Sequence, residues 1–483
     1  MSPILVLGFV LGYFLLLMLI AKMTSKGATN EAFFIGAKQS PWYLVAFGMI
    51  GASLSGVTFI SIPGWVGDSA FSYMQVVFGY FFGYVVIATV LMPLYYKMNL
   101  TSIYSYLETR FGYFSYKTGA SFFLLSRIVG ASFRLFLVAS VLQYLIFDSW
   151  DVPFFATVAL SIVFIWLYTN KGGIKTIVWT DSLQTLFMLI SVGIAVYTIS
   201  TELNLTFGSM IDEISNSDYG QLFFFEDFND KKHFVKQFVS GIFITIVMTG
   251  LDQDMMQKNL SCKNIKEAQK NMFTFSIVLI FVNLLFLALG ALLFMYATAN
   301  GIDIPEKTDH LFPLIATEHL PVFAGIFFIL GLIAAAYSSA DSALTSLTTS
   351  VCVDFLNVNK RANPDGIREK VHLLISFVLF VVILVFNAIN EESVISALFT
   401  AAGYTYGPLL GLYAFGLMTK KQVKDKWVPL VCIISPILSY VIHLNSEAWL
   451  WGYKFGFEIL LVNGVLTFMG LLIIQKNELI KAG

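Results

Sequence analysis

Long apolar segments recur along the whole chain and are separated by short polar ones. Thirteen of them reach the roughly 20 residues that a helix needs to cross the hydrocarbon core of a bilayer. They lie near residues 3–21, 42–64, 73–95, 119–146, 153–169, 177–199, 235–257, 272–297, 321–350, 371–389, 393–417, 428–444 and 455–474. The pattern predicts an all-α membrane protein with thirteen transmembrane helices, whose two termini lie on opposite sides of the membrane.

The composition agrees with this prediction. Of the 483 residues, 57% are hydrophobic and only 12% are charged, about half the charged share of a typical soluble domain. So little charge does not cover the surface of a soluble protein, and we expect the lipid bilayer as a partner, with no nucleic acid and no obligatory protein partner. The three cysteines, Cys262, Cys352 and Cys432, show neither pairing nor metal-ligand spacing and are interpreted as free thiols.

Basic residues gather in every second polar segment. Most of the 29 Lys and Arg residues, Lys258 among them, fall in segments that the thirteen-helix topology assigns to the cytoplasm. The positive-inside rule then places the N-terminus outside and the C-terminus inside a plasma (inner) membrane. The first apolar segment lacks the features of a cleaved signal peptide, so we expect it to be retained as a helix. A short helix is expected on the outer face at residues 308–319.

Polar residues inside the ninth apolar segment form a stripe. In "AAAYSSADSALTSL" and just beyond it, helical spacing places these residues on one face: Ser338, Asp341, Ser342, Thr345 and Thr349. Small polar residues also serve close helix packing. An aspartate in the middle of a membrane helix costs at least about 3 kcal/mol, however, so it points to function. Carboxylate and hydroxyl oxygens are the ligands of a hard cation, and we predict an ion site here.

Two other segments carry membrane-buried charge. In the sixth, Asp181 shares a helix face with Gln184 and Thr185, and it is either a partner of the ninth segment or a carboxylate that caps the start of its helix. In the fourth, Arg127 and Arg134 are seven residues apart on one face. They suit either a bidentate carboxylate anchor or a structural ion pair.

Glycines interrupt the second segment, at Gly48, Gly51 and Gly56, and the seventh, at Gly241 and Gly250. Glycine and small hydroxyl residues allow either close helix packing or a break that exposes carbonyls to a cavity. The two segments are five helices apart. Interrupted helices in matching positions of two halves point to an inverted repeat with a binding site near the middle of the membrane.

Several stretches resemble the sodium/solute symporter family, in matching order from about residue 1 to 475. They are "EAFFIGAKQSPWYLVAFGMIGASLSGVTFISIPG", "TSIYSYLETRFG", "GGIKTIVWTDSLQTLFM", "GLDQDMMQKNLSCKN" and "AAAYSSADSALTSL". The resemblance implies one transmembrane domain over residues 1–483 with a LeuT-like five-plus-five inverted repeat. The expected parts are a leading helix at 3–21, repeats at 42–199 and 235–417, and two last helices at 428–474.

The resemblance also implies site residues. The first sodium site would use carbonyls and hydroxyls of Gly51, Leu54, Ala335, Ser338 and Ser339. A second sodium site would use Asp181, Ser338, Asp341 and Ser342, where Asp341 departs from the hydroxyl that the family has. Substrate contacts are expected from Ser53, Ser55, Thr58, Arg134, Thr245 and Thr249. The glutamine that helps sialate binding in some members has no clear counterpart, since Val77 falls near its position with Gln75 close by.

The resulting hypothesis is a sodium-coupled symporter, with sodium as coupling ion and no cofactor. It would import a small polar solute, a sugar, amino acid or organic acid, by alternating access. Proton coupling through Asp181 and Asp341 is the alternative, because two close carboxylates do not both stay ionised. A solute sensor is a weaker alternative, because about eight residues after the last helix hold no signalling domain. An enzyme is not expected, because the five histidines show no catalytic or metal spacing.

Overall fold

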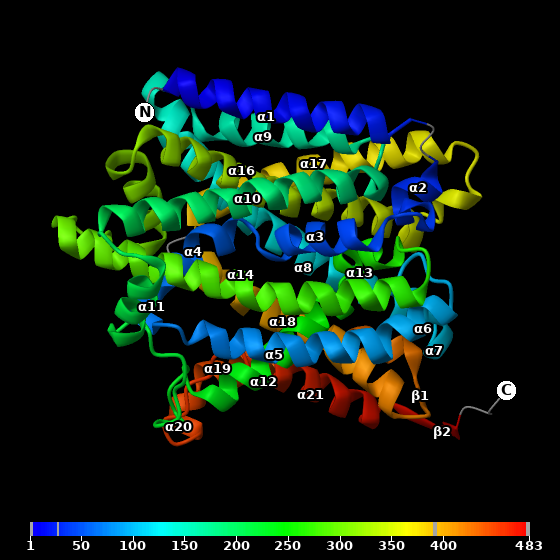
Figure 1. Cartoon of the computed structure of the whole chain (residues 1–483). Coiled ribbons are helices and arrows are strands. Elements are labelled where there is room, and N and C mark those ends of the chain that lie inside the picture. Colours follow the sequence, from blue (N-terminus) through cyan, green and yellow to red (C-terminus); the bar gives the residue numbers. More distant parts are fainter. Residues whose placement is uncertain (1–2, 27–28, 390–393, 480–483) are drawn as a thin grey trace.

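The computed structural model describes residues 3–26, 29–389 and 394–479, and the chain there is almost entirely helical (Figure 1). Each predicted apolar segment coincides with a helix or with a pair of consecutive helices. The unbroken matches are α1 (Pro3–Thr24), α5 (Tyr73–Val86) with α6 (Met92–Lys97), α8 (Tyr113–Leu142), α9 (Phe154–Thr169), α10 (Ile174–Glu202), α14 (Ile265–Asn300), α16 (Val322–Ser350), α17 (Pro364–Ile389), α18 (Val394–Met418), α19 (Val428–Leu444) and α21 (Ile459–Ile473). By length and hydropathy, eight described helices qualify as membrane spans, or ten if bent pairs count as one span each. The total of thirteen spans stays a prediction.

Two spans are broken in the middle. Helices α3 (Trp42–Ser53) and α4 (Gly56–Ser69) meet at a bend of 56°. Helix α12 (Phe234–Thr245) continues as a wide turn to Gly250 and then meets α13 (Gln253–Leu260) at 65°. At a helix break the last carbonyls of one half and the first N–H groups of the other lose their helical partners. The breaks suggested by the glycine pattern are therefore present in both segments.

The glycines beside the first break also allow close packing. A Cβ on Gly51 would lie 2.3 Å from Thr185 Oγ1 of α10, and one on Gly56 would lie 2.9 Å from Val138 Cγ2 of α8. The break itself falls between them, at Leu54, whose φ of −91° and ψ of 75° are not helical. Small-residue packing and unwinding thus occur together in this segment.

Helix α16 lies between α9 and α10 in Figure 1, beside α17. It packs against α10, α8, α4, α17 and α3. Every residue from Leu332 to Ser350 is buried, so no face of this stretch meets lipid. The polar stripe of the ninth segment therefore contacts protein over its whole length.

Short elements connect the spans. They are α2 (Asn30–Ile35), α7 (Ser105–Arg110), α11 (Phe207–Asn216), α15 (Leu311–Leu314) and α20 (Ser446–Trp449). The expected helix at 308–319 is present as a 3₁₀ turn, α15 and a wide turn ending at His319. Two antiparallel strands, β1 (Lys421–Val423) and β2 (Gln475–Leu479), were not predicted by the all-helical pattern. Helix α1 begins at one end of the molecule and β2 lies at the other (Figure 1).

Candidate functional site

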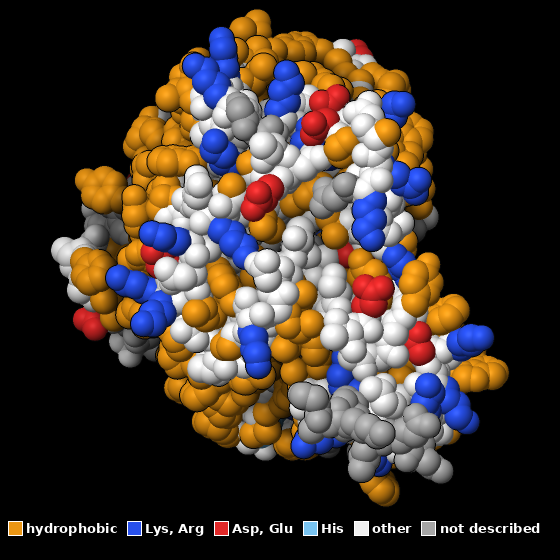
Figure 2. Space-filling model, turned by 90° about the vertical axis from the view of Figure 1, so that its right-hand side faces the viewer, with side chains coloured by type: hydrophobic (Ala, Val, Ile, Leu, Met, Phe, Trp, Pro, Cys, Tyr) orange, Lys and Arg blue, Asp and Glu red, His pale blue; other side chains and the backbone are white. Residues whose placement is uncertain are grey.

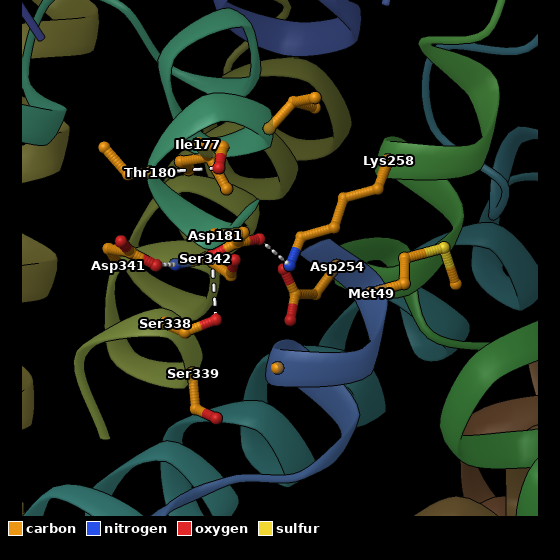
Figure 3. A network of polar contacts seen from close by, with 12 residues as sticks. Met49, Ile177, Thr180, Asp181, Asp254, Lys258, Ser338, Ser339, Asp341 and Ser342 are labelled. Atoms are coloured by element: carbon orange, nitrogen blue, oxygen red, sulfur yellow. Dashed lines mark hydrogen bonds and ion pairs between the residues drawn. The ribbon is translucent and has the colours of Figure 1, made fainter. Parts of the chain in front are cut away.

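Asp181 of α10 and Ser338 of α16 meet at the centre of the bundle. The Ser338 hydroxyl donates a hydrogen bond to Asp181 Oδ1 over 2.8 Å, and neither residue is exposed. Ser342 lies beside Asp181 in Figure 3, one helical turn further along α16. Among the described residues no N–H group at the start of α10 donates to this carboxylate, which instead contacts α16.

Asp341 has its own partners, one residue before Ser342. The Tyr168 hydroxyl of α9 donates to Asp341 Oδ2 over 2.8 Å, and the Ser342 backbone N–H donates to Asp341 Oδ1 over 2.5 Å. Asp341 is fully buried and forms no ion pair within the described part of the chain. The two carboxylates predicted for a second cation site thus lie on neighbouring helices but accept different hydrogen bonds.

Lys258 completes this cluster, and its position differs from the sequence prediction. Its Nζ lies 2.7 Å from Asp181 Oδ2, and the residue is 1% exposed (Figure 3). The charge pattern had assigned Lys258 to a cytoplasmic segment. The correction has a physical reason, because α13 bends inward after the break and directs the start of that basic segment into the bundle.

The residues predicted for the first sodium site flank the break between α3 and α4. Ser338 and Ser339 lie on the side of α16 that faces this broken helix (Figure 3). A Cβ on Gly56 would lie 3.5 Å from the Ala336 Cβ of α16, which is ordinary contact distance. The Ser339 hydroxyl reaches only the Ala335 carbonyl, over 3.5 Å. Ser338, Ser339 and the Ala335 carbonyl thus lie on the helix that packs against the broken span, and the part of Gly51 and Leu54 as ligands stays a prediction.

A central cavity of about 80 Å³ lies next to the break. All six predicted substrate residues line it: Ser53, Ser55, Thr58, Arg134, Thr245 and Thr249. The sequence prediction missed its aromatic and amide lining, of which Tyr73, Tyr80, Tyr84 and Asn283 are examples. These residues carry no signal in the sequence, because single tyrosines and asparagines on a membrane helix are also common packing residues.

The two arginines of α8 differ in their surroundings. Arg127 forms an ion pair with Asp254 and lies 4.0 Å from Asp252, so it is the structural pair. Arg134 is 7% exposed and forms no ion pair within the described residues, and its Nε lacks a hydrogen-bond acceptor there. Arg134 also lines the cavity. Arg127 lines the cavity too and also has an Nε without an acceptor, so what distinguishes Arg134 is that its charge has no ion-pair partner among the described residues.

A second cavity, of about 780 Å³, opens at one end of the molecule. Helices α4 and α12 line both cavities: Ser61 and Ser240 face the large one, and Thr58 and Thr245 face the central one. Arg127, which pairs with Asp254, lines the central cavity as well, and the ion pair of Lys258 with Asp181 lies buried in the bundle. The two cavities therefore lie along the same two helices, α4 and α12.

The known proteins that are similar in sequence are sodium-coupled transporters. The sequence matches the sodium:solute symporter family over residues 33–425. It is 26% identical to the sodium/sialic acid symporter NanT of Aliivibrio fischeri, over 81% of this chain and 78% of the relative. It is 24% identical to the human sodium-coupled monocarboxylate transporter 2, over 81% of this chain and 64% of the relative.

Solved structures share the fold. One of them is a Na⁺-coupled sialic acid symporter in a substrate-bound outward-open state, with a TM-score of 0.83, 19% identity and coverage of 98% and 99% of the two chains. Another is Mhp1, a nucleobase-cation-symport-1 family transporter, with a TM-score of 0.53, 14% identity and coverage of 91% and 92%. The fold is therefore that of LeuT-like symporters. Together with the family match over most of the sequence, this shows that the chain belongs to the sodium:solute symporter family, and that it is a sodium-coupled transporter rather than an enzyme.

Proposed function

We propose that the protein imports a small organic acid together with Na⁺. The observation that carries the proposal is Arg134, a buried guanidinium that lines the central cavity without an ion-pair partner among the described residues. A buried charge without a partner is costly. A guanidinium fork matches a carboxylate in a bidentate way, so a carboxylate solute is the ligand that compensates it best.

The size and lining of the central cavity limit which carboxylates can be the solute. A cavity of about 80 Å³ holds on the order of half a dozen waters, at roughly 10–15 Å³ each. A carboxylate of a few carbon atoms fits this volume better than a nine-carbon sialic acid does. Hydroxyls of Ser53, Thr58 and Thr245 suit a hydroxy or keto group beside the carboxylate. The monocarboxylate transporters among the relatives support this class.

Sodium coupling follows from the place of the break. The carbonyls of Gly51 and Leu54, the carbonyl of Ala335 and the hydroxyls of Ser338 and Ser339 are the ligands that we propose for the first site. A sodium ion there would hold the broken helix against α16 and fix the cavity wall. One Na⁺ and one carboxylate together carry no net charge, so the membrane potential does no work on the pair. A tenfold inward Na⁺ concentration gradient supplies about 1.4 kcal/mol, which concentrates the solute about 10-fold.

The direction of transport is inferred from the surface charge. Figure 2 shows one end of the molecule, where Lys and Arg side chains are spread over a wide face and Asp and Glu are fewer. This end includes Lys97 at the end of α6 and Arg110 at the end of α7. The positive-inside rule assigns it to the cytoplasm. The large cavity would then open to the outside, and the N-terminus would be external.

Proton coupling is the second candidate. It is favoured by Asp341, a buried carboxylate without an ion pair in the described chain, which needs a cation or a proton to be neutralised. In this version the proton would replace one sodium ion.

The experiment is uptake by proteoliposomes with an imposed inward gradient. Radiolabelled lactate, pyruvate, propionate and sialic acid would be offered, with lactamide as an uncharged competitor. We expect a Na⁺ gradient to drive uptake of a short carboxylate, and lactamide not to compete. Uptake that follows a pH gradient alone would support proton coupling instead, and sialic acid as sole substrate would overturn the size argument.

Arg134→Gln is the matching variant. Removal of one partner of a buried charge pair costs about 2–5 kcal/mol, so KM for the carboxylate should rise at least about 30-fold. Binding of ²²Na⁺ in the absence of solute should be unchanged, which shows that the variant is folded. An unchanged KM would contradict the carboxylate anchor.

A further inference from the structure

Lys258 is a buried cation that contacts Asp181, a residue predicted to bind a second sodium ion. It belongs to α13, the second half of the broken span, and its Nζ contacts Asp181 Oδ2 at 2.7 Å. Asp181 Oδ1 accepts the Ser338 hydroxyl. The ammonium therefore binds the carboxylate and approaches the hydroxyl set, Ser338 and Ser342, that was predicted to bind a second sodium ion (Figure 3).

The other acidic group near the ammonium is engaged elsewhere. Asp254 lies close by in Figure 3, but its carboxylate pairs with Arg127. Within the described residues, Asp181 is the one carboxylate in an ion pair with Lys258. The positive charge of Lys258 thus compensates the negative charge of Asp181, and a sodium ion on the same carboxylate would meet a second cation at close range.

The ammonium is held by charge rather than by a full set of acceptors. An ammonium has three N–H donors, yet Lys258 Nζ makes no further hydrogen bond among the described residues. The Ser342 hydroxyl lies beside the same carboxylate, Asp181 (Figure 3). Both groups are buried. The positive charge of Lys258 is therefore balanced by Asp181 inside the bundle, at the end of a flexible side chain.

We propose that Lys258 is a tethered cation that occupies the second sodium site, so that the chain binds one sodium ion, at the first site, and not two. The inference rests on the proposed sodium function and adds its stoichiometry. Asp341 remains with its donors from Tyr168 and the Ser342 backbone and does not complete a sodium cage. Lys258 thus determines the number of sodium ions that are transported with each solute molecule.

The test counts bound sodium directly. Purified full-length protein in detergent is saturated with ²²Na⁺ in choline medium without solute. We expect one ion per chain in the wild type and two in Lys258→Met, in which a side chain of similar length carries no charge. Lys258→Arg, which keeps the cation, should bind one. The double variant Lys258→Met with Asp181→Asn should return to one.

A second measurement serves if Lys258→Met does not fold, as judged by size-exclusion chromatography. Asp181→Asn alone should still bind one ion, because the wild-type protein does not use Asp181 for sodium. A loss of binding in Asp181→Asn would overturn the inference.

The outcomes separate the two proposals. Two ions in the wild type, or one ion in folded Lys258→Met, would overturn the role of Lys258 and leave sodium coupling intact. A wild type that binds no ²²Na⁺ would overturn sodium coupling itself, and the inference with it.

Discussion

Residues of the same type have different roles here according to which of their polar atoms already have partners. On α16 the Ser338 hydroxyl is bonded to Asp181, and the Ser346 hydroxyl donates to its own helix at Ala343 O over 3.0 Å. Ser339 makes only the long 3.5 Å contact with Ala335 O. A hydroxyl that donates keeps its lone pairs, so what suits Ser339 to a cation is its position facing the break in another helix (Figure 3). Ser339 is thus distinguished from its neighbours by its surroundings and not by its chemistry.

This distinction predicts the effect of two alanine substitutions. Ser339→Ala should raise the sodium Kd about 10-fold, because the loss of an oxygen contact to a charged group costs about 1.5 kcal/mol. Ser346→Ala is the control, since Ser346 is buried on the same helix but is bonded to its own backbone. Titration of each variant with ²²Na⁺ gives the two Kd values, and equal values would remove Ser339 from the site.

At the scale of elements, the two broken helices end for different local reasons. Leu54, at the end of α3, has a non-helical backbone without a glycine at that position. Helix α13 begins at a side-chain cap, because Asp252 accepts the Asp254 N–H over 2.8 Å and the Met255 N–H over 3.3 Å. Such caps contribute about 1 kcal/mol. Asp252 also accepts the Tyr406 hydroxyl of α18, so one carboxylate fixes the second break to a neighbouring helix.

The packing of the first break can be tested at Gly51. Its N–H donates to Thr185 Oγ1 over 3.0 Å, and an added Cβ would lie 2.3 Å from that same atom. Gly51→Ala should therefore push α3 away from α10, at a cost of about 1–3 kcal/mol. We expect a lower melting temperature in detergent and a weaker sodium affinity.

Gly193→Ala is the matched control for this prediction. Gly193 lies within a helix like Gly51, but in α10, the partner of α3. An added Cβ on Gly193 would meet nothing within 4 Å. If Gly51→Ala melts and binds sodium as Gly193→Ala does, the close approach at Gly51 does not support the site.

At the scale of the whole molecule, the two ends differ. A large cavity opens at one end, and the buried ion pairs of Arg127 and Lys258 lie inside the bundle. Solute and sodium would enter from the hollow end, and release would require that these pairs separate. All three native cysteines are buried, so introduced cysteines can report which end faces outward.

Cysteine labelling tests the orientation. Thr308 lines the large cavity, and Lys424 is exposed next to β1 at the opposite end. In intact cells, a membrane-impermeant thiol reagent should label Thr308→Cys at once and Lys424→Cys only after permeabilisation. Ser346→Cys, buried in α16, should remain unlabelled in both conditions. The reverse order for the first two would place the N-terminus in the cytoplasm.

Much of this architecture follows from local sequence patterns. Apolar length sets the helices, because an unpaired backbone is not tolerated in hydrocarbon. The positions of glycine and small hydroxyl residues indicated both breaks, and the stripe with Asp341 indicated the polar face of α16. Each of these features is a property of consecutive residues, and the physical cost that produces it acts on one segment at a time.

The tertiary structure decided which buried charges are neighbours. Arg127 and Arg134 look equivalent along α8, but of the two only Arg127 forms ion pairs within the described residues, with Asp252 and Asp254 at the start of α13. Lys258 looks like one more cytoplasmic lysine until the bend before α13 brings it to Asp181. The reason is that electrostatic pairing depends on distances of a few ångströms between helices that are far apart in sequence. The sequence by itself determined which residues are costly to bury, and the packing of helices determined how each cost is compensated.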